Sequence, residues 1–115
     1  KDTKNYNYDK EKFFEALDIS QLSNLKNFID EKKDIQTGEK GSLLSSGQGQ
    51  RISIARAIYN SRPIMIFDEA TNALDLKTED LILKAILKWK QDRTLIFISH
   101  KKETLKYCTK ILDLD

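Results

Sequence analysis

Hydrophobic residues in the first part of the chain recur every three or four positions, the spacing that places them on one face of an α-helix. Two helices are expected there, one after Asp9 and one after Ser20, because both residue types cap helix N-termini. Their apolar positions are Phe13, Phe14 and Leu17 in the first, and Leu22, Leu25, Phe28 and Ile29 in the second. A polar, turn-rich segment follows at 31–44.

A third helix is expected from Ser45. Ser45 and Gln48 have the spacing of a capping box, in which each side chain satisfies a backbone N–H of the first turn. A stripe of apolar residues follows at helical spacing, made of Ile52, Ala55, Ile58 and Tyr59. Asn60, Ser61 and Arg62 close the helix, and Pro63 stops any continuation because proline lacks the backbone N–H that a helix interior uses.

Short apolar runs replace the helical spacing from Ile64 onward. Strands are predicted at 64–67, 94–99 and 110–114, and the first run is wholly apolar, as in a strand buried on both faces. Helices are predicted at about 78–90 and 103–107, the former with Leu81, Ile82, Ala85, Ile86 and Trp89 facing inward. This alternation indicates parallel strands joined by right-handed crossovers. The fold class is therefore α/β: a helical subdomain at 1–60, then a parallel β-α-β-α-β core at 61–115.

Composition narrows the class of protein. The 115 residues suffice for one small domain, and 20 basic against 18 acidic residues leave a net charge of +2. This balance argues against a nucleic-acid or membrane-surface binder, which would gather one sign of charge. Cys108 is the single cysteine, so no internal disulfide forms. No apolar run approaches the ~20 residues that span a bilayer. The chain begins at Lys1 without an initiator methionine, and we interpret it as a piece of a longer polypeptide.

Reactive side chains follow two of the predicted strands. Asp68 and Glu69 come directly after the first strand, and His100 follows the second. Ligands of open parallel sheets bind beyond the carboxyl ends of the strands, so these groups are expected to face one site. Asp68 is suited to hold Mg²⁺, and Glu69 to polarise an attacking water. The alternative is that Asp68 caps the following helix and Glu69 is an ordinary surface acid.

Glycines in the first turn of the predicted third helix are a second indication of a ligand site, in this case one for an anion. Gly47 and Gly49 lie in its first turn, where free backbone N–H groups and the helix dipole bind anions. Glycine lets a phosphate approach the backbone closely, and the Ser45 hydroxyl is a further donor. A plain capped helix explains the same residues.

Four short stretches of the sequence, in this order along the chain, resemble the motifs of one protein family. The stretch 44–51 resembles the signature motif of ATP-binding-cassette (ABC) proteins, and 64–69 resembles Walker B with its catalytic glutamate. The stretch 72–75 looks like the D-loop, and His100 stands where the switch histidine belongs. The resemblance covers about 10–115 and implies the later part of an ABC nucleotide-binding domain, with an incomplete P-loop NTPase fold. Thr37–Gly41 also resembles an exporter-type segment that touches coupling helices of the transmembrane domain.

This resemblance implies ATP and Mg²⁺ as cofactors and a role for each site residue. Asp68 would position the metal, Glu69 would act on the hydrolytic water, and His100 would contact the γ-phosphate. The residues implied in nucleotide binding across a head-to-tail dimer are Ser45, Ser46, Gly47, Gln48 and Asp75, the last linking the two protomers. Ser46 replaces the first glycine of the usual signature pair, which leaves open a weakened site.

One element of the family pattern is missing. The chain contains no Gly-x-x-x-x-Gly-Lys-Ser/Thr loop, which cradles the β- and γ-phosphates. The chain alone is therefore expected neither to bind ATP tightly nor to hydrolyse it.

The favoured interpretation is part of the motor of an ATP-driven exporter, on the cytoplasmic face of a membrane. Its partners would be a second nucleotide-binding domain and the transmembrane domain, with no nucleic acid. The alternative is a soluble ABC-type ATPase acting on DNA or ribosomes. A chromosome-type ATPase would show a long heptad coiled coil before the signature, whereas 9–44 predicts two short helices and a glycine turn. A third hypothesis is a non-catalytic regulatory remnant. The presence of Asp68, Glu69 and His100 argues against it.

Overall fold

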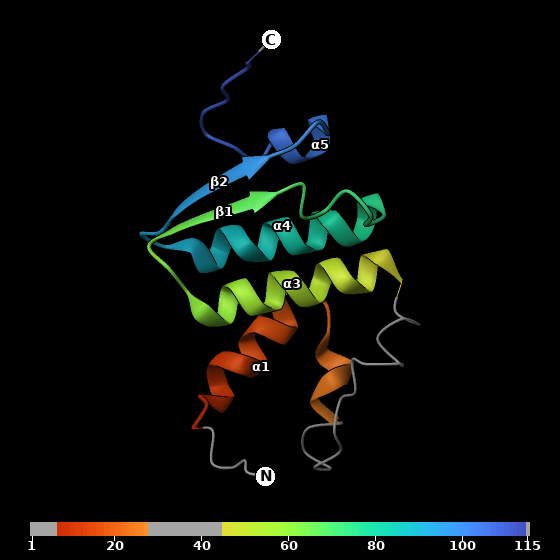
Figure 1. The fold of residues 1–115 in the computed structure, drawn as a ribbon, viewed down its shortest axis with the longest axis vertical. Helices are drawn as coiled ribbons and strands as arrows, with labels where there is room; N and C mark the ends of the chain where they lie inside the picture. The colour runs from red at the N-terminus through yellow and green to blue at the C-terminus, as the bar shows by residue number, and fades with distance from the viewer. Residues whose placement is uncertain (1–6, 28–44, 115) are drawn as a thin grey trace.

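The computed structural model describes residues 7–27 and 45–114 (Figure 1). Its elements are α1 (Lys10–Ile19), the 3-10 turn η1 (Ser23–Leu25), α3 (Ser46–Asn60), β1 (Ile64–Asp68), α4 (Leu76–Lys90), β2 (Thr94–Ile98) and α5 (Lys102–Leu105). β1 and β2 pair in parallel, in a register that runs from Ile64 opposite Thr94 to Asp68 opposite Ile98. The predicted β-α-β unit is confirmed, with α4 as the connection between neighbouring strands.

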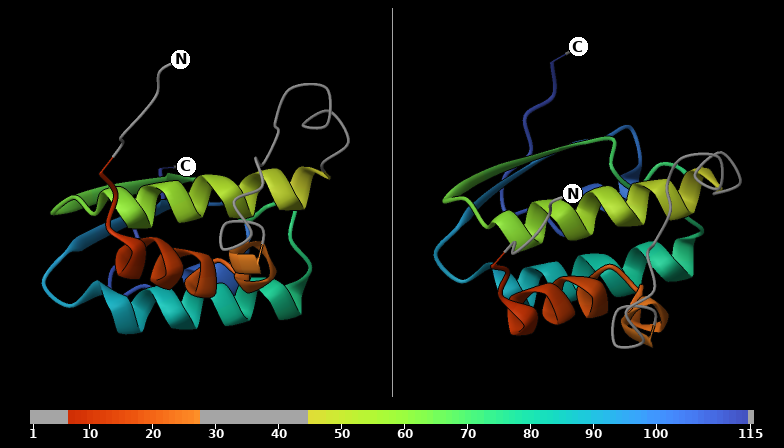
Figure 2. Two further views of the ribbon diagram at one scale, coloured as in Figure 1. Left: turned by 90° about the horizontal axis from the view of Figure 1, so that it is seen from below. Right: turned by 60° about the horizontal axis from the view of Figure 1, so that its bottom comes forward.

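The elements form layers around one core. Figure 1 shows α3 and α4 between the sheet and α1, and Figure 2 shows α1 against both helices on the side away from the sheet. The most deeply buried apolar residues are Ala16, Ile54, Ile58, Ile82, Leu83 and Ile86. Burial of each leucine or isoleucine contributes about 1.5–3 kcal/mol. Within residues 7–27 and 45–114, no helix is long and apolar enough to cross a membrane.

Local capping chemistry sets the helix starts. Asp9 caps α1 by accepting a hydrogen bond from the Lys12 N–H at 3.1 Å. Ser45 Oγ accepts from the Gln48 N–H at 3.1 Å, and Gln48 Oε1 accepts from the Ser45 N–H at 2.9 Å. Both predicted starts, and the capping box, are confirmed. α3 ends before Pro63, as predicted, with Ser61 in a left-handed conformation at its C-cap.

The prediction that Ser20 starts a second helix is wrong. Ser20 is the C-cap of α1, and its buried hydroxyl donates to the Ala16 carbonyl at 2.7 Å. A serine hydroxyl satisfies free backbone groups at either end of a helix, so the residue type alone does not distinguish a start from an end. Phe28, Ile29 and the turn segment 31–44 lie outside the described residues.

The prediction that the first strand is buried on both faces is also wrong. Met65 and Phe67 are buried against the helices, whereas Ile64 and Ile66 are each 63% exposed on the opposite face. In the part of the chain that the structure describes, helices cover only one face of the sheet. On α4, Ile82 and Ile86 are buried as predicted, whereas Leu81 is 44% exposed, contrary to the prediction. Glu79 and Leu83, for which no inward position was predicted, are also buried.

No strand forms at 110–114, contrary to the third strand that the apolar pattern predicts. Ile111, Leu112 and Leu114 are all exposed there. A strand needs a neighbour for its backbone N–H and C=O groups, and within the described residues no further strand lies beside this segment. Residues 110–114 thus have the apolar pattern of a strand, but no strand among the described residues pairs with them.

Candidate functional site

The carboxyl ends of β1 and β2 bring Glu69 and His100 together. The backbone N–H of Glu69 donates to the carbonyl of Ile98, the last residue of β2, at 2.8 Å. Glu69 Oε2 lies 3.5 Å from His100 Nε2, and the histidine side chain is 89% exposed. Glu69 and His100 therefore lie together at one edge of the sheet, as predicted. The exposed His100 side chain is accessible to a ligand from solvent.

The backbone of Glu69 is in an unusual conformation. Its φ is 49°, in the left-handed region that residues other than glycine seldom occupy. Such a conformation costs of order 1–3 kcal/mol and persists where surrounding contacts determine it. Here the N–H is held by Ile98, and the carbonyl accepts a hydrogen bond from Gln50 Nε2 at 3.1 Å. The turn that aims the Glu69 carboxylate is thus fixed on both sides.

Asp68 ends β1 on the open face of the sheet. It shares that face with Ile64 and Ile66, because side chains alternate along a strand. It does not cap the following helix, since the N-cap of α4 is Asp75. The described residues contain no cluster of three or more metal-ligating side chains. One exposed carboxylate nevertheless fits Mg²⁺, which is bound by one or two carboxylates together with substrate phosphates and water.

A hollow of about 380 Å³ lies where the start of α3 meets the loop before α4. It is lined by Ser45, Ser46, Gly47, Arg51, Ala73, Leu74, Asp75 and Thr78. Four of the five residues predicted to bind nucleotide thus share one surface. The fifth, Gln48, is exposed, but its side chain turns back to the Ser45 N–H.

Gly47 lies in close contact with the loop before α4. A Cβ at position 47 would lie 3.3 Å from the Ala73 carbonyl oxygen and 3.4 Å from Leu74 Cδ2. The start of α3 therefore sits directly on the loop before α4. Gly49 has open space around it, so the two glycines differ in role. The sequence predicts for Gly47 either a close approach of phosphate or a place in a plain capped helix, and neither interpretation reveals this contact.

Asp75 places an ionised carboxylate at the rim of the hollow. It accepts from the Thr78 hydroxyl at 2.7 Å and from the Thr78 N–H at 3.1 Å. These bonds, the hydroxyl first, hold the pKa of Asp75 below its usual range. The residue therefore also caps α4, a role that its sequence motif did not reveal.

A buried carboxylate that the sequence reasoning missed lies behind the site. Glu79 is 1% exposed, and it accepts from Thr71 Oγ1 at 2.6 Å and from Thr104 Oγ1 at 2.5 Å. Lys101 Nζ lies 3.1 Å from its other oxygen, Oε1. Lys101 follows His100 directly, and Thr71 lies in the loop after Glu69. Helical spacing contained the signal, because Glu79 stands three positions before the buried Ile82.

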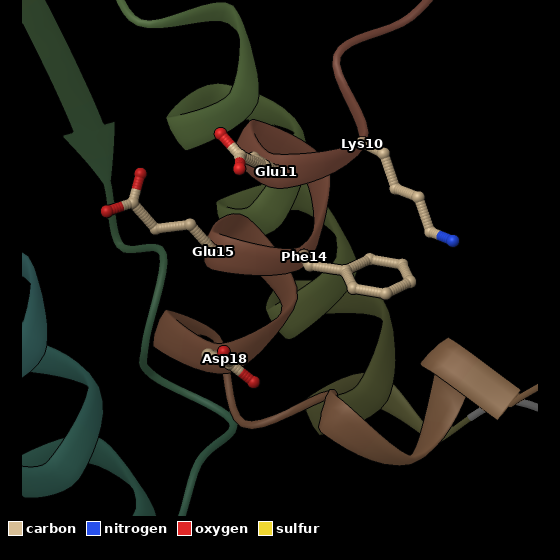
Figure 3. A pocket seen from close by; sticks show the side chains of 5 residues that line it. All are labelled: Lys10, Glu11, Phe14, Glu15 and Asp18. Carbon is tan, nitrogen blue, oxygen red and sulfur yellow. The ribbon is translucent and has the colours of Figure 1, made fainter.

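Another hollow formed by the described residues lies away from this surface. It measures about 480 Å³ and is lined by Lys10, Glu11, Phe14, Glu15 and Asp18, all from α1 (Figure 3). Figure 3 shows Lys10 and Phe14 projecting to one side of the helix and the two glutamates to the other. Three carboxylates against one ammonium disfavour a triphosphate. None of the predicted site residues lines it.

Comparison with known proteins gives consistent relatives. The family model described as ABC transporter matches residues 3–72. Putative multidrug export ATP-binding/permease proteins of Staphylococcus aureus strains bovine RF122 / ET3-1 and NCTC 8325 / PS 47 are each 38% identical over 104 residues. That alignment spans 88% of this chain and 18% of each relative.

Solved structures agree with this fold. A bacterial Atm1-family ABC exporter with ATP bound superposes with a TM-score of 0.75 at 32% identity, over 88% of this chain and 18% of that one. A dimeric bacterial ABC transporter cassette gives a TM-score of 0.65 at 26% identity, over 91% of this chain and 43% of that one.

Proposed function

The chain belongs to the ABC transporter family, and on that premise we propose that it is part of the ATP-hydrolysing motor domain of an ABC exporter. The observation that carries the proposal is the 3.5 Å approach of Glu69 to His100 at the ends of two neighbouring strands. The export names of the relatives favour a transporter over a soluble ATPase acting on DNA or ribosomes. Because the chain spans 18% of those relatives, transport belongs to a longer protein.

In this proposal each side chain has one task. The Glu69 carboxylate accepts a hydrogen bond from the attacking water and orients it toward the γ-phosphate. His100 donates a hydrogen bond to that phosphate from its exposed position. Asp68 would hold Mg²⁺, which would supply positive charge against the phosphates of the nucleotide. The fixed backbone turn at Glu69 keeps its carboxylate in position before ATP arrives.

The hollow at the start of α3 is proposed to serve the nucleotide of a partner domain. Free N–H groups of the first helical turn favour phosphate oxygens there. Ser45, Ser46, Gly47, Gln48 and Asp75 are the proposed contacts. Residues 1–60 form the helical subdomain and residues 61–115 the α/β core in this arrangement. The domain pairs head to tail and couples to a transmembrane domain on the cytoplasmic face of the membrane.

Replacing His100 by alanine in the full-length protein tests the proposal. ATP turnover is expected to fall about 10- to 100-fold, since one donor to the transferring phosphate is lost, with a smaller effect on nucleotide affinity. Phosphate release and ATP binding measure the two effects. Lys102→Ala, at an exposed neighbouring position, is the control. The chain by itself lacks the phosphate loop and provides the zero-turnover background. Turnover in His100→Ala equal to the control contradicts the proposal.

A further inference from the structure

We propose that Gln50, on α3, is a positioning residue that fixes the direction of the Glu69 carboxylate. Through it, the end of α3 that faces the partner's nucleotide is mechanically joined to the catalytic residue of this chain's own site. The inference rests on the proposed function and deepens it. It assigns a role to a side chain that touches no nucleotide in that proposal.

The Gln50 amide bridges both parts of the loop between β1 and α4. Its Nε2 donates to the Glu69 carbonyl at 3.1 Å and to Asn72 Oδ1 at 2.5 Å. Its Oε1 accepts from the Ala73 N–H at 2.9 Å. Both the donor and the acceptor end of one planar group are therefore used on a loop some twenty positions away in sequence.

The first of these bonds acts where the loop is strained. Glu69 has a φ of 49°, and its N–H is held by Ile98 on β2 at 2.8 Å. Among the described residues, its carbonyl has one other hydrogen-bond partner, the Asn72 N–H at a long 3.4 Å. Gln50 is therefore the main restraint on the peptide that follows Glu69. Without it, the described contact left on this carbonyl is the long bond from the Asn72 N–H, and the carboxylate is held less firmly in its direction toward His100.

Gln50 also connects two nucleotide contacts in space. It lies on α3 two residues after Gln48, and the loop that it bonds packs against Gly47 through the Ala73 carbonyl. A shift of the helix start on the partner's ATP therefore reaches Glu69 through a continuous chain of hydrogen bonds and packing contacts. This gives one site a physical route to the chemistry of the other.

The experiment uses the full-length protein with Gln50→Ala and Gln50→Glu. The glutamate keeps an acceptor for the Ala73 N–H but loses the donor to the Glu69 carbonyl. For both variants kcat is expected to fall about 10- to 100-fold, the scale on which misplaced catalytic groups act, with KM for ATP within about twofold. Ser53→Ala, at an exposed position three residues further along α3, is the matched control and keeps wild-type kcat.

A double-mutant cycle separates positioning from general damage. If Gln50 acts through Glu69, adding Gln50→Ala to Glu69→Gln leaves the residual single-turnover rate unchanged. The inference is overturned if Gln50→Ala lowers the rate of Glu69→Gln by the same factor as it lowers the rate of the wild type. Wild-type kcat in either Gln50 variant overturns it as well. If Gln50→Ala does not fold, the kcat of Gln50→Glu tests the inference. Hydrogen exchange of the backbone amides at 69–73 is then the second readout, and faster exchange than in the wild type is expected. If Glu69→Gln leaves turnover intact, the proposed function fails. If Glu69→Gln lowers the rate by the expected ~10²- to 10⁴-fold, the proposed function stands and the residual single-turnover rate tests the inference alone.

Discussion

Replacing Glu69 by glutamine in the full-length protein is expected to abolish ATP hydrolysis while ATP-driven pairing of the domains survives. Glutamine keeps the shape of the side chain but lacks the carboxylate that accepts a hydrogen bond from the attacking water. Loss of a general base costs about 10²- to 10⁴-fold in rate. The backbone bonds of Glu69 to Ile98 and Gln50 do not involve its side chain, so the turn is retained. Phosphate release and ATP-dependent sedimentation measure the two properties.

Glu103→Gln is the control for this experiment, because Glu103 is an exposed acid near the site on α5. It is expected to leave turnover unchanged. Turnover of Glu69→Gln within about twofold of the wild type would remove Glu69 from the catalytic role.

Replacing Glu79 by alanine is expected to lower the free energy of unfolding of the full-length protein's ATP-binding domain by about 3 kcal/mol. The substitution leaves Thr71, Thr104 and Lys101 without their shared buried partner. Polar groups left unsatisfied in the interior keep their full desolvation cost. Denaturant unfolding followed by circular dichroism measures the loss.

Asp80→Ala is the matched control on the same helix. Asp80 pairs with Lys84 at 3.0 Å on the surface, where an ion pair contributes about 0–1 kcal/mol. An equal loss of unfolding free energy in the two variants would show that the buried hydrogen bonds of Glu79 contribute no more to stability than a surface ion pair.

The pH dependence of stability checks the same carboxylate. Burial raises the pKa of Glu79, but hydrogen bonds from Thr104, Thr71 and Lys101, and the charge of Lys101, outweigh burial and leave the pKa below its usual range. A lowered pKa in the folded state stabilises the protein above the ordinary glutamate pKa, about 4.3. That stability is lost as the pH falls through the lower folded value. The unfolding free energy of Glu79→Ala is expected to depend less steeply on pH in this range.

Elements fixed by local chemistry were predictable from the sequence. Asp9 and Ser45 start helices because their side chains cap N–H groups three positions later. The convergence of Glu69 and His100 followed from a general rule about parallel strand ends. The same rules misled at Ser20, whose hydroxyl closes a helix, and at 110–114, whose apolar residues have no neighbouring strand in the described part of the chain.

Residues that act through distant partners were not predictable. Gln50 contacts a loop nineteen to twenty-three positions away, and Thr104 bonds Glu79 across twenty-five. Sequence spacing shows neither contact, because both depend on how α3, α4 and α5 pack. The prediction that Leu81 faces inward on α4 was wrong for a related reason. An apolar side chain was assumed to face inward, whereas the buried position is taken by a hydrogen-bonded acid.

The most direct test of the central claim is a structure of the full-length Glu69→Gln protein with ATP and Mg²⁺. We expect Asp68 at the metal, position 69 and His100 against the γ-phosphate, and the partner's copy of the Ser45 helix start facing the same nucleotide. A nucleotide bound with Asp68, position 69 and His100 all turned away from its phosphates would contradict the claim.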